Sequence, residues 1–415
     1  MKDLLEICCG LDVHKDMVVA CLLKGELGKE PEGEIVEFST LLSGLDNLKN
    51  WLIQNNCRDV AMESTGVYWF QIYNVLESMF ADEGGVRITV TNPRHMKNVP
   101  GKKTDTNDAK WIAGLLRAGL LAPSYIPPRD VRELRNWTRY RRVLVQQMTG
   151  HKNRIEKFLQ QCGFKLSTFL TDIYGLSGMT IIKRLCAVGF VAAADVDSMV
   201  FSVARKKIPE IRQAVNGKLN AHERDFLSAL VRVYEHSQGE IATVESKIME
   251  CAQKFDSAIS LIVKIPGIQR LTAATIISEI GTDLSMFPSA GHLCSWVGMC
   301  PGNNESAGKK KSTRITQGNV YLKSVLCQCA WVASRAKNTY MRDWFFKLSR
   351  RRGMRKAVIA LGRKMLVVIY NILTTGEGYD ENRFEDAKVK YDDIRKKRLI
   401  AEAKKLGLEV IPTLA

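Results

Sequence analysis

Two long heptad patterns constrain the fold of this chain more than any other feature. Apolar or aromatic residues recur at alternating spacings of three and four over Leu134–Cys162 and again over Leu227–Phe255. Arg141 and His151 interrupt the first pattern, and the second runs through Ser237. Each pattern covers about four heptads, which is typical of a long helix in a coiled coil. The two helices could fold back as an antiparallel pair, form the seam of a dimer, or lie on a globular core as ordinary amphipathic helices.

The segment before the heptads has the pattern of an α/β domain. Ile7–Leu23 contains two apolar runs separated by the polar VHKD, which predicts a β-hairpin. Further short apolar runs alternate with stretches of helical periodicity. We expect strands over Asp59–Glu63 and Val86–Val90, and helices over Val67–Met79 and Thr106–Leu121.

The segment after the heptads is helical again. Helical periodicity returns from Lys264, a polar loop interrupts it at 300–314, and charged residues dominate from Glu377. A chain of 415 residues is long enough for roughly two or three domains. We expect an α/β domain over 1–125, a coiled-coil or helical arm over 126–258, a helical domain over 259–376 and a charged tail over 377–415.

The charge of the chain indicates a polyanionic partner. Lys and Arg total 61 against 44 acidic residues, a net charge of +17. Nucleic acid is the first expectation and an acidic membrane surface the second. We expect no membrane insertion, because the apolar run Met365–Tyr370 ends at Asn371 and is too short to span a bilayer. The 11 cysteines include no CxxC pair, which favours free thiols in a reducing cytoplasm over a zinc site.

Four acidic residues form a candidate metal site. Asp12 falls in the first expected strand, Glu63 ends a later strand, and Asp105 and Asp108 lie at the start of an expected helix. Such positions can converge at one edge of an α/β sheet. Converging carboxylates repel one another unless a cation such as Mg²⁺ neutralises them, and bound Mg²⁺ keeps room for substrate phosphates. Asp108 could instead serve only as a helix cap.

The polar loop at 300–314 contains a candidate nucleophile. Ser306 precedes a run of cations, which are Lys309, Lys310, Lys311 and Arg314. A serine beside a phosphate needs a base or metal to remove its proton and cations to stabilise the developing charge. The ordinary interpretation is a solvated loop, and Ser289, Ser295 and Ser312 are nearby competitors.

A second basic cluster lies towards the C-terminus. Arg350–Arg352 is followed by Arg355 and Lys356. Runs of charge are usually solvated faces, but in a chain this basic we expect Arg351 and Arg355 to contact a nucleic-acid backbone.

Three stretches give a resemblance to a known family. GLDVHKD at 10–16, MESTGVYW at 62–69 and KTDTNDAKWIAGLLR at 103–117 resemble the N-terminal part of the IS110-family transposases. These are DEDD recombinases with a RuvC-like, RNase H-type domain. The resemblance implies that Asp12, Glu63, Asp105 and Asp108 are the family's four metal-binding acids and that Mg²⁺ is the cofactor.

The second half of the chain is similar to the C-terminal transposase domain of the same family. The similarity covers IPGIQRLTAATIISEIG at 265–281 and the segment from WVGMC through the loop to YLKSVL, at 296–326. It implies that Ser306 is the nucleophile. The family has Ser-Gly where this chain has Ser-Ala-Gly, so Ser312 is the alternative if the loop register shifts.

The resemblance implies a fold class and a function. The fold would be α/β plus α: an RNase H-like (RuvC-like) domain, a coiled-coil arm and a helical transposase domain. The function would be DNA transposition through the acids and a phosphoserine, with a structured guide RNA, as a homodimer or homotetramer in a bacterial or archaeal cytoplasm at the nucleoid. The alternatives are a RuvC-like structure-specific DNA nuclease and a non-catalytic nucleic-acid-binding regulator.

Overall fold

The structure is a computed structural model that describes residues 3–64, 66–83, 85–93, 108–302, 304–306, 309–312, 314–382 and 385–408. The chain divides into two compact units, residues 1–126 and 127–415. Asp105 lies outside the described residues.

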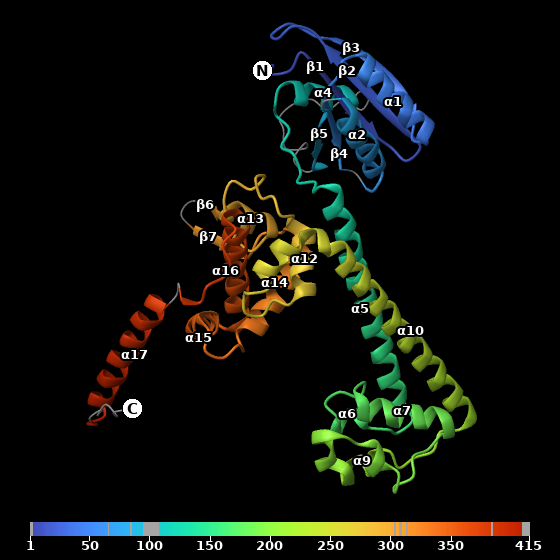
Figure 1. Ribbon diagram of the computed structural model, residues 1–415, viewed down its shortest axis with the longest axis vertical. Helices are drawn as coiled ribbons and strands as arrows, with labels where there is room; N and C mark the ends of the chain where they lie inside the picture. The colour runs from blue at the N-terminus through green and yellow to red at the C-terminus, as the bar shows by residue number, and fades with distance from the viewer. Residues whose placement is uncertain are drawn as a thin grey trace. The chain divides into compact units, whose positions relative to one another are not determined.

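The first unit is built on a mixed five-stranded sheet of order β3-β2-β1-β4-β5 (Figure 1). β1 pairs antiparallel with β2, and β2 with β3, whereas β1, β4 and β5 run parallel. With helices packed against the sheet, this topology is consistent with an RNase H-like fold. The strands are β1 Ile7–Val13, β2 Met17–Lys24, β3 Glu32–Ser39, β4 Asp59–Glu63 and β5 Arg87–Thr91.

Side chains alternate between the two faces of this sheet. Leu11 and Val13 of β1 belong to a core that also contains buried leucines of α1 (Leu42–Gln54) and the buried Leu76 of α2 (Trp69–Glu83). Cys8 of β1 belongs to the core on the other face, with α4 (Asp108–Arg117). The hairpin, the strand at 59–63 and the helices corresponding to α2 and α4 confirm the sequence predictions.

Two elements of this unit, β3 and α1, were not predicted. β3 contains several glutamates, which are uncommon in strands, and as an edge strand it is mostly exposed. α1 begins after Leu41, which provides no side-chain cap. Packing of Leu45, Leu48 and Leu52 against the sheet holds this helix in place.

The second unit contains the two heptad helices as an antiparallel pair. They are α5 (Arg129–Gln161) and α10 (Ala221–Ala252), and they lie side by side (Figure 1). Asp130 at the start of α5 pairs with Lys254 just after α10 at 2.6 Å, and Arg141 pairs with Glu245. The rings of Phe158 and Phe226 meet near the opposite ends. Of the three sequence-based alternatives, the structure therefore has the pair within one chain.

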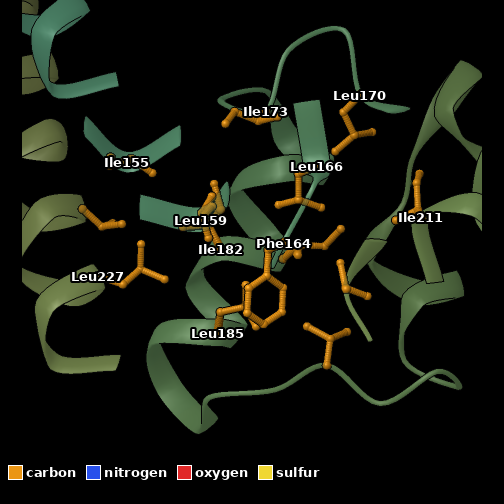
Figure 2. Close-up of a cluster of buried hydrophobic side chains, with 14 of the residues drawn as sticks. Ile155, Leu159, Phe164, Leu166, Leu170, Ile173, Ile182, Leu185, Ile211 and Leu227 are labelled. Atoms are coloured by element: carbon orange, nitrogen blue, oxygen red, sulfur yellow. The ribbon is translucent and has the colours of Figure 1, made fainter. Parts of the chain in front are cut away.

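The chain between α5 and α10 forms a small helical cap with its own core. Phe164 lies at the centre, surrounded by side chains of α5, α7, α9 and α10 (Figure 2). The heptad patterns did not predict this core. Its elements are α6 Leu166–Phe169, α7 Leu176–Val188, α8 Val196–Met199, the 3₁₀ helix η1 Ser202–Lys207 and α9 Ile208–Ala214.

The rest of the second unit is helical apart from one small hairpin. α16 packs against α13, α14 and α15. The elements are η2 Gln253–Phe255, α11 Asp256–Ile262, α12 Arg270–Ile280, α13 Ala290–Val297, β6 Asn304–Ser306, β7 Lys309–Ser312, α14 Val320–Ala333, α15 Tyr340–Arg352, α16 Met354–Thr375 and α17 Glu385–Lys405.

Among the described helices, α16 is the one that is long and apolar enough to cross a membrane. Its apolar face, including Leu361, Met365 and Ile369, is buried against the neighbouring helices of the same unit. This packing explains the composition of α16 as that of a core helix.

Candidate active site

Three of the four predicted acids lie at one edge of the sheet. Asp12 is near the end of β1, Glu63 ends β4 and Asp108 begins α4. β1 and β4 are parallel with Leu11 opposite Met62, so the next residues, Asp12 and Glu63, are neighbours at the carboxyl ends of the two strands. Leu11 and Met62 point into the core on one face. By alternation, Asp12 and Glu63 point to the opposite face, which α4 covers.

Gly10 brings the start of α4 to these two acids. A Cβ atom at Gly10 would lie 2.3 Å from the Ala109 carbonyl oxygen and 2.4 Å from the Ala113 nitrogen, so the backbone of α4 rests directly on β1. The Leu4 N–H donates to the Arg117 carbonyl at 2.8 Å, which shows that α4 runs antiparallel to β1. The N-terminal residue of α4, Asp108, therefore lies at the same end of β1 as Asp12.

The donor chemistry at this edge fits a divalent cation. Carboxylate oxygens are the ligands that Mg²⁺ prefers. Within the described residues, no three His, Cys, Asp or Glu side chains form a group that could hold one metal ion. The fourth acid of the predicted set, Asp105, is outside those residues. His14 Nε2 lies 3.1 Å from Asp12 Oδ2, so this histidine contacts the site through Asp12.

Replacing Gly10 by Ala should disturb this edge specifically. The added methyl group must push α4 away from β1, and such overpacking costs about 1–3 kcal/mol. We expect a lower melting temperature and weaker DNA cleavage, because the start of α4 moves relative to Asp12. Gly114→Ala, a substitution within α4 itself, is the matched control, since a Cβ at Gly114 meets nothing within 4 Å. Thermal unfolding and cleavage of both variants check this, and equal behaviour would contradict it.

The loop with the candidate nucleophile is a β-hairpin in the second unit. Ser306 pairs with Lys309, and Asn304 pairs with Ser312. Two hydrogen bonds close its base: Gly302 N–H donates to Arg314 O at 2.8 Å, and Thr316 N–H to Cys300 O at 3.2 Å. Ser306 is thus at the closed end of the hairpin, and Ser312 is nearer its base. The two candidate serines therefore lie at opposite ends of the hairpin.

Gly318 and Asn319 anchor the hairpin on the helices. A Cβ at Gly318 would lie 2.4 Å from Gly298 N, and Gly298 ends α13 with a positive φ of 76°. Only glycines allow this close approach. Asn319 caps α14 by accepting hydrogen bonds from the N–H groups of Tyr321 and Leu322. Gly318 and Asn319 therefore have structural roles in this chain.

Glu279 is the centre of a buried polar network that the sequence did not single out. It is 1% exposed, and Arg139 of α5 donates to both carboxylate oxygens at 2.9 Å. Asn319 Nδ2 donates to it at 2.6 Å, and Arg135 lies 3.7 Å away. Burial opposes ionisation, but the hydrogen bonds from Arg139 and Asn319 outweigh it and hold the pKa of Glu279 below its ordinary value. One sequence signal could have indicated Glu279: it is an acidic residue between Ile277 and Ile280 in an otherwise apolar helix.

The predicted basic residues lie at two places in the second unit. Lys309, Lys310 and Lys311 belong to β7, and Arg314 follows it. The second cluster surrounds the turn at Gly353, between α15 and α16. Arg351, Arg352 and Arg355 are exposed there, and no ion pair to an acid is found for them among the described residues. The exposed arginines around Gly353 are available to a polyanion.

Comparison with known proteins identifies the family. A model of the DEDD transposases of the IS110 type matches residues 9–164. A second model, described as the transposase IS116/IS110/IS902 family, matches residues 259–345. Together the two matches cover more than half of the chain. The chain belongs to the IS110 family of transposases.

Individual relatives of this IS110-family transposase cover different shares of it. The transposase for insertion sequence element IS1111A of Coxiella burnetii is 26% identical over 389 residues, 91% of this chain and 92% of the relative. An insertion element IS110 protein of Streptomyces coelicolor is 23% identical over 68% of this chain and 73% of the relative. The pilin gene-inverting protein of Moraxella bovis is 27% identical over 34% of this chain and 44% of the relative.

The family membership settles the class of this protein. A transposase of the IS110 family is an enzyme that cleaves DNA and transfers DNA strands, so DNA is a partner. The net charge of +17 suits that partner. The resemblance found in the sequence is confirmed, and the DEDD type of the first match is consistent with a divalent metal.

Proposed function

We propose that this transposase joins DNA strands through a covalent phosphoserine formed by Ser306, with Asp12, Glu63, Asp105 and Asp108 holding Mg²⁺. The observation that carries the acid half of this proposal is the close packing of α4 on β1 at Gly10, which aligns Asp12, Glu63 and Asp108 at one edge. The placement of Ser306 at the closed end of a hairpin supports the serine half, because a nucleophile must reach a phosphate on another molecule.

The chemistry conserves phosphodiester bonds. The Ser306 hydroxyl attacks the phosphorus of the DNA strand, the bond from phosphorus to the 3′ oxygen breaks, and the proton leaves with a free 3′-hydroxyl. A 3′-hydroxyl of a second strand then attacks the phosphoserine and releases the serine. Bound Mg²⁺ would supply charge neutralisation at the phosphate. Lys309, Lys310, Lys311 and Arg314 would attract the DNA near the serine, and Arg351 and Arg355 would contact its backbone.

The partners beyond DNA follow from the family resemblance. We propose a structured guide RNA and a homodimer or homotetramer in which the acids and the serine of different protomers meet. The basic surfaces at β7 and around Gly353 would serve RNA as well as DNA. The named relatives are bacterial, so the site of action would be inside the cell, on the nucleoid.

A trapping assay tests the serine. The protein is incubated with Mg²⁺, RNA from the flanking DNA and labelled DNA ends, then denatured and separated by size. We expect label on the wild-type protein and on Ser312→Ala, and none on Ser306→Ala. An adduct on Ser306→Ala that is lost in Ser312→Ala would transfer the role to Ser312. Cleavage by Ser306→Ala without any adduct would indicate a hydrolytic nuclease instead.

A further inference from the structure

A polar pocket lies among three helices of the second unit. Its volume is about 440 Å³, and side chains of α5, α12 and α14 line it. This volume is within the range of pockets that bind small molecules or single groups of larger ones. The helices approach one another there (Figure 1) because Arg135 and Arg139 of α5 bind Glu279 of α12, and Asn319 joins α14 to the same carboxylate.

The lining is cationic and rich in hydrogen-bonding groups. Three arginines of α5 face it, and two of them are matched with acids: Arg139 with Glu279, and Arg141 with Glu245. Arg142 is different, since its hydrogen bond among the described residues is a long one, 3.4 Å, to the Val320 carbonyl. Three arginines and one acid, Glu279, line the pocket, and even with Glu245 beside Arg141 the charge of Arg142 is not balanced by an acid among the described residues, which favours an anionic ligand.

The aromatic wall of the pocket is held rigidly. The Arg139 guanidinium carbon lies 4.1 Å from the centre of the Tyr321 ring, and that of Arg142 lies 4.8 Å away. The bidentate bond to buried Glu279 fixes Arg139 in this position. Guanidinium planes and tyrosine rings are surfaces on which unpaired nucleobases stack.

The rim of the pocket can recognise the edge of a base. Gln146, Gln269 and Gln328 are exposed lining residues, and Thr272 and Ser324 lie deeper. Glutamine amides both donate and accept, so they can pair with the hydrogen-bonding edge of a nucleobase. A nucleotide can fill all three positions, because its phosphate can bind the arginine, the flat ring of its base can stack, and the polar edge of the same base can pair with the amides.

We propose that this pocket holds an unpaired nucleotide of a nucleic-acid strand, with its phosphate on Arg142 and its base against the Arg–Tyr321 wall. The proposal rests on the protein's action on nucleic acid, but not on Ser306 or on the four acids. DNA and RNA share this chemistry, and the test distinguishes them. The pocket would thereby fix a strand in register at a point where the duplex is interrupted.

The test compares a duplex that has one unpaired 2-aminopurine nucleotide with the same duplex fully paired. Binding is measured by fluorescence anisotropy, with DNA and with RNA, in the Ser306→Ala protein without Mg²⁺, so that no cleavage contributes. We expect the unpaired nucleotide to tighten binding about tenfold and the 2-aminopurine emission to change on binding. A stronger effect in DNA assigns the pocket to a DNA strand, and a stronger effect in RNA assigns it to an RNA strand.

Matched variants connect the effect to the pocket. Arg142→Gln should abolish both the tenfold preference and the emission change. Arg129→Gln removes the same charge from the same helix, at a side chain that is 81% exposed, and should retain both. Gln328→Leu alters the exposed rim without touching Glu279 and should reduce the preference. Equal binding of paired and unpaired duplexes by the Ser306→Ala protein, or an unchanged preference in Arg142→Gln, would overturn the proposal. Failure of the adduct assay would leave this result standing.

Discussion

Asp12→Asn should abolish DNA cleavage while leaving the fold intact. Asparagine has the same shape and still accepts a hydrogen bond from His14, which lies 3.1 Å from the aspartate oxygen. The amide lacks the negative charge that a divalent cation requires. A metal ion contributes several kcal/mol to stabilising the charge of a reacting phosphate, so we expect the rate to fall on the order of a thousandfold.

The measurement is a cleavage time course with labelled DNA ends at saturating Mg²⁺, accompanied by thermal unfolding. Asp46→Asn is the matched control, because Asp46 is exposed on α1, whose leucines pack on the other face of the sheet. It should cleave at the wild-type rate. If Asp12→Asn cleaves as fast as Asp46→Asn, the acids are structural and the non-catalytic interpretation gains support. DNA binding without Mg²⁺ should be unchanged in both variants, since neither removes a basic residue.

Glu279→Leu should cause the largest loss of stability among single substitutions of charged residues in the second unit. It leaves Arg135, Arg139 and Asn319 without their common acceptor, and removing one partner of a buried ion pair costs about 3–5 kcal/mol. The helices α5, α12 and α14 meet at this carboxylate, so their packing should loosen together. Urea unfolding followed by circular dichroism measures the effect.

Glu245→Leu is the control for Glu279→Leu. Glu245 of α10 pairs with Arg141 of α5, the helix that also contains Arg139, but the Glu245 side chain is 37% exposed. Partly exposed pairs contribute about 0–1 kcal/mol. Similar losses in the two variants would show that the network around Glu279 does not hold the helices together.

The pH dependence gives a second test of the Glu279 network. The pKa of Glu279 is lowered in the folded protein, so its ionised form favours folding. This contribution is complete at neutral pH and is lost as the pH falls through the ordinary carboxyl range towards the lowered pKa. The stability difference between wild type and Glu279→Gln should therefore shrink on acidification.

Patterns that repeat along the chain were readable from the sequence. The heptads predicted α5 and α10 because a helix must bury one continuous stripe, and the apolar stripe recurs at a fixed spacing. Short apolar runs predicted β1, β2 and β4, because strands buried on both faces are apolar at nearly every position. β3 is a mostly exposed edge strand, and α1 has leucines at helical spacing but no side-chain cap, so both depend on contacts with the sheet. Their absence from the prediction follows from that dependence on neighbours.

The acids and their convergence at a sheet edge could be expected from the sequence, but the contact that brings α4 to β1 could not. The family motifs gave Asp12, Glu63, Asp105 and Asp108 as a set, whereas the packing of α4 on β1 depends on two segments about a hundred residues apart. Gly10 has no side chain and therefore no pattern of its own. Its role appears only when the carbonyl of Ala109 lies 2.3 Å from where a Cβ would be.

The sequence by itself determined the helical periods, the basic charge and the family of this protein, because each is a property of local or summed residue types. The tertiary structure alone decided how α5 and α10 pair and which residues bind Glu279. It also decided that Gly318 packs against Gly298. Those features depend on contacts between residues far apart in the chain, and a buried carboxylate is stable only when the fold brings the arginines and the amide to it. The pocket beside Tyr321 exists for the same reason, since its three walls come from three separate helices.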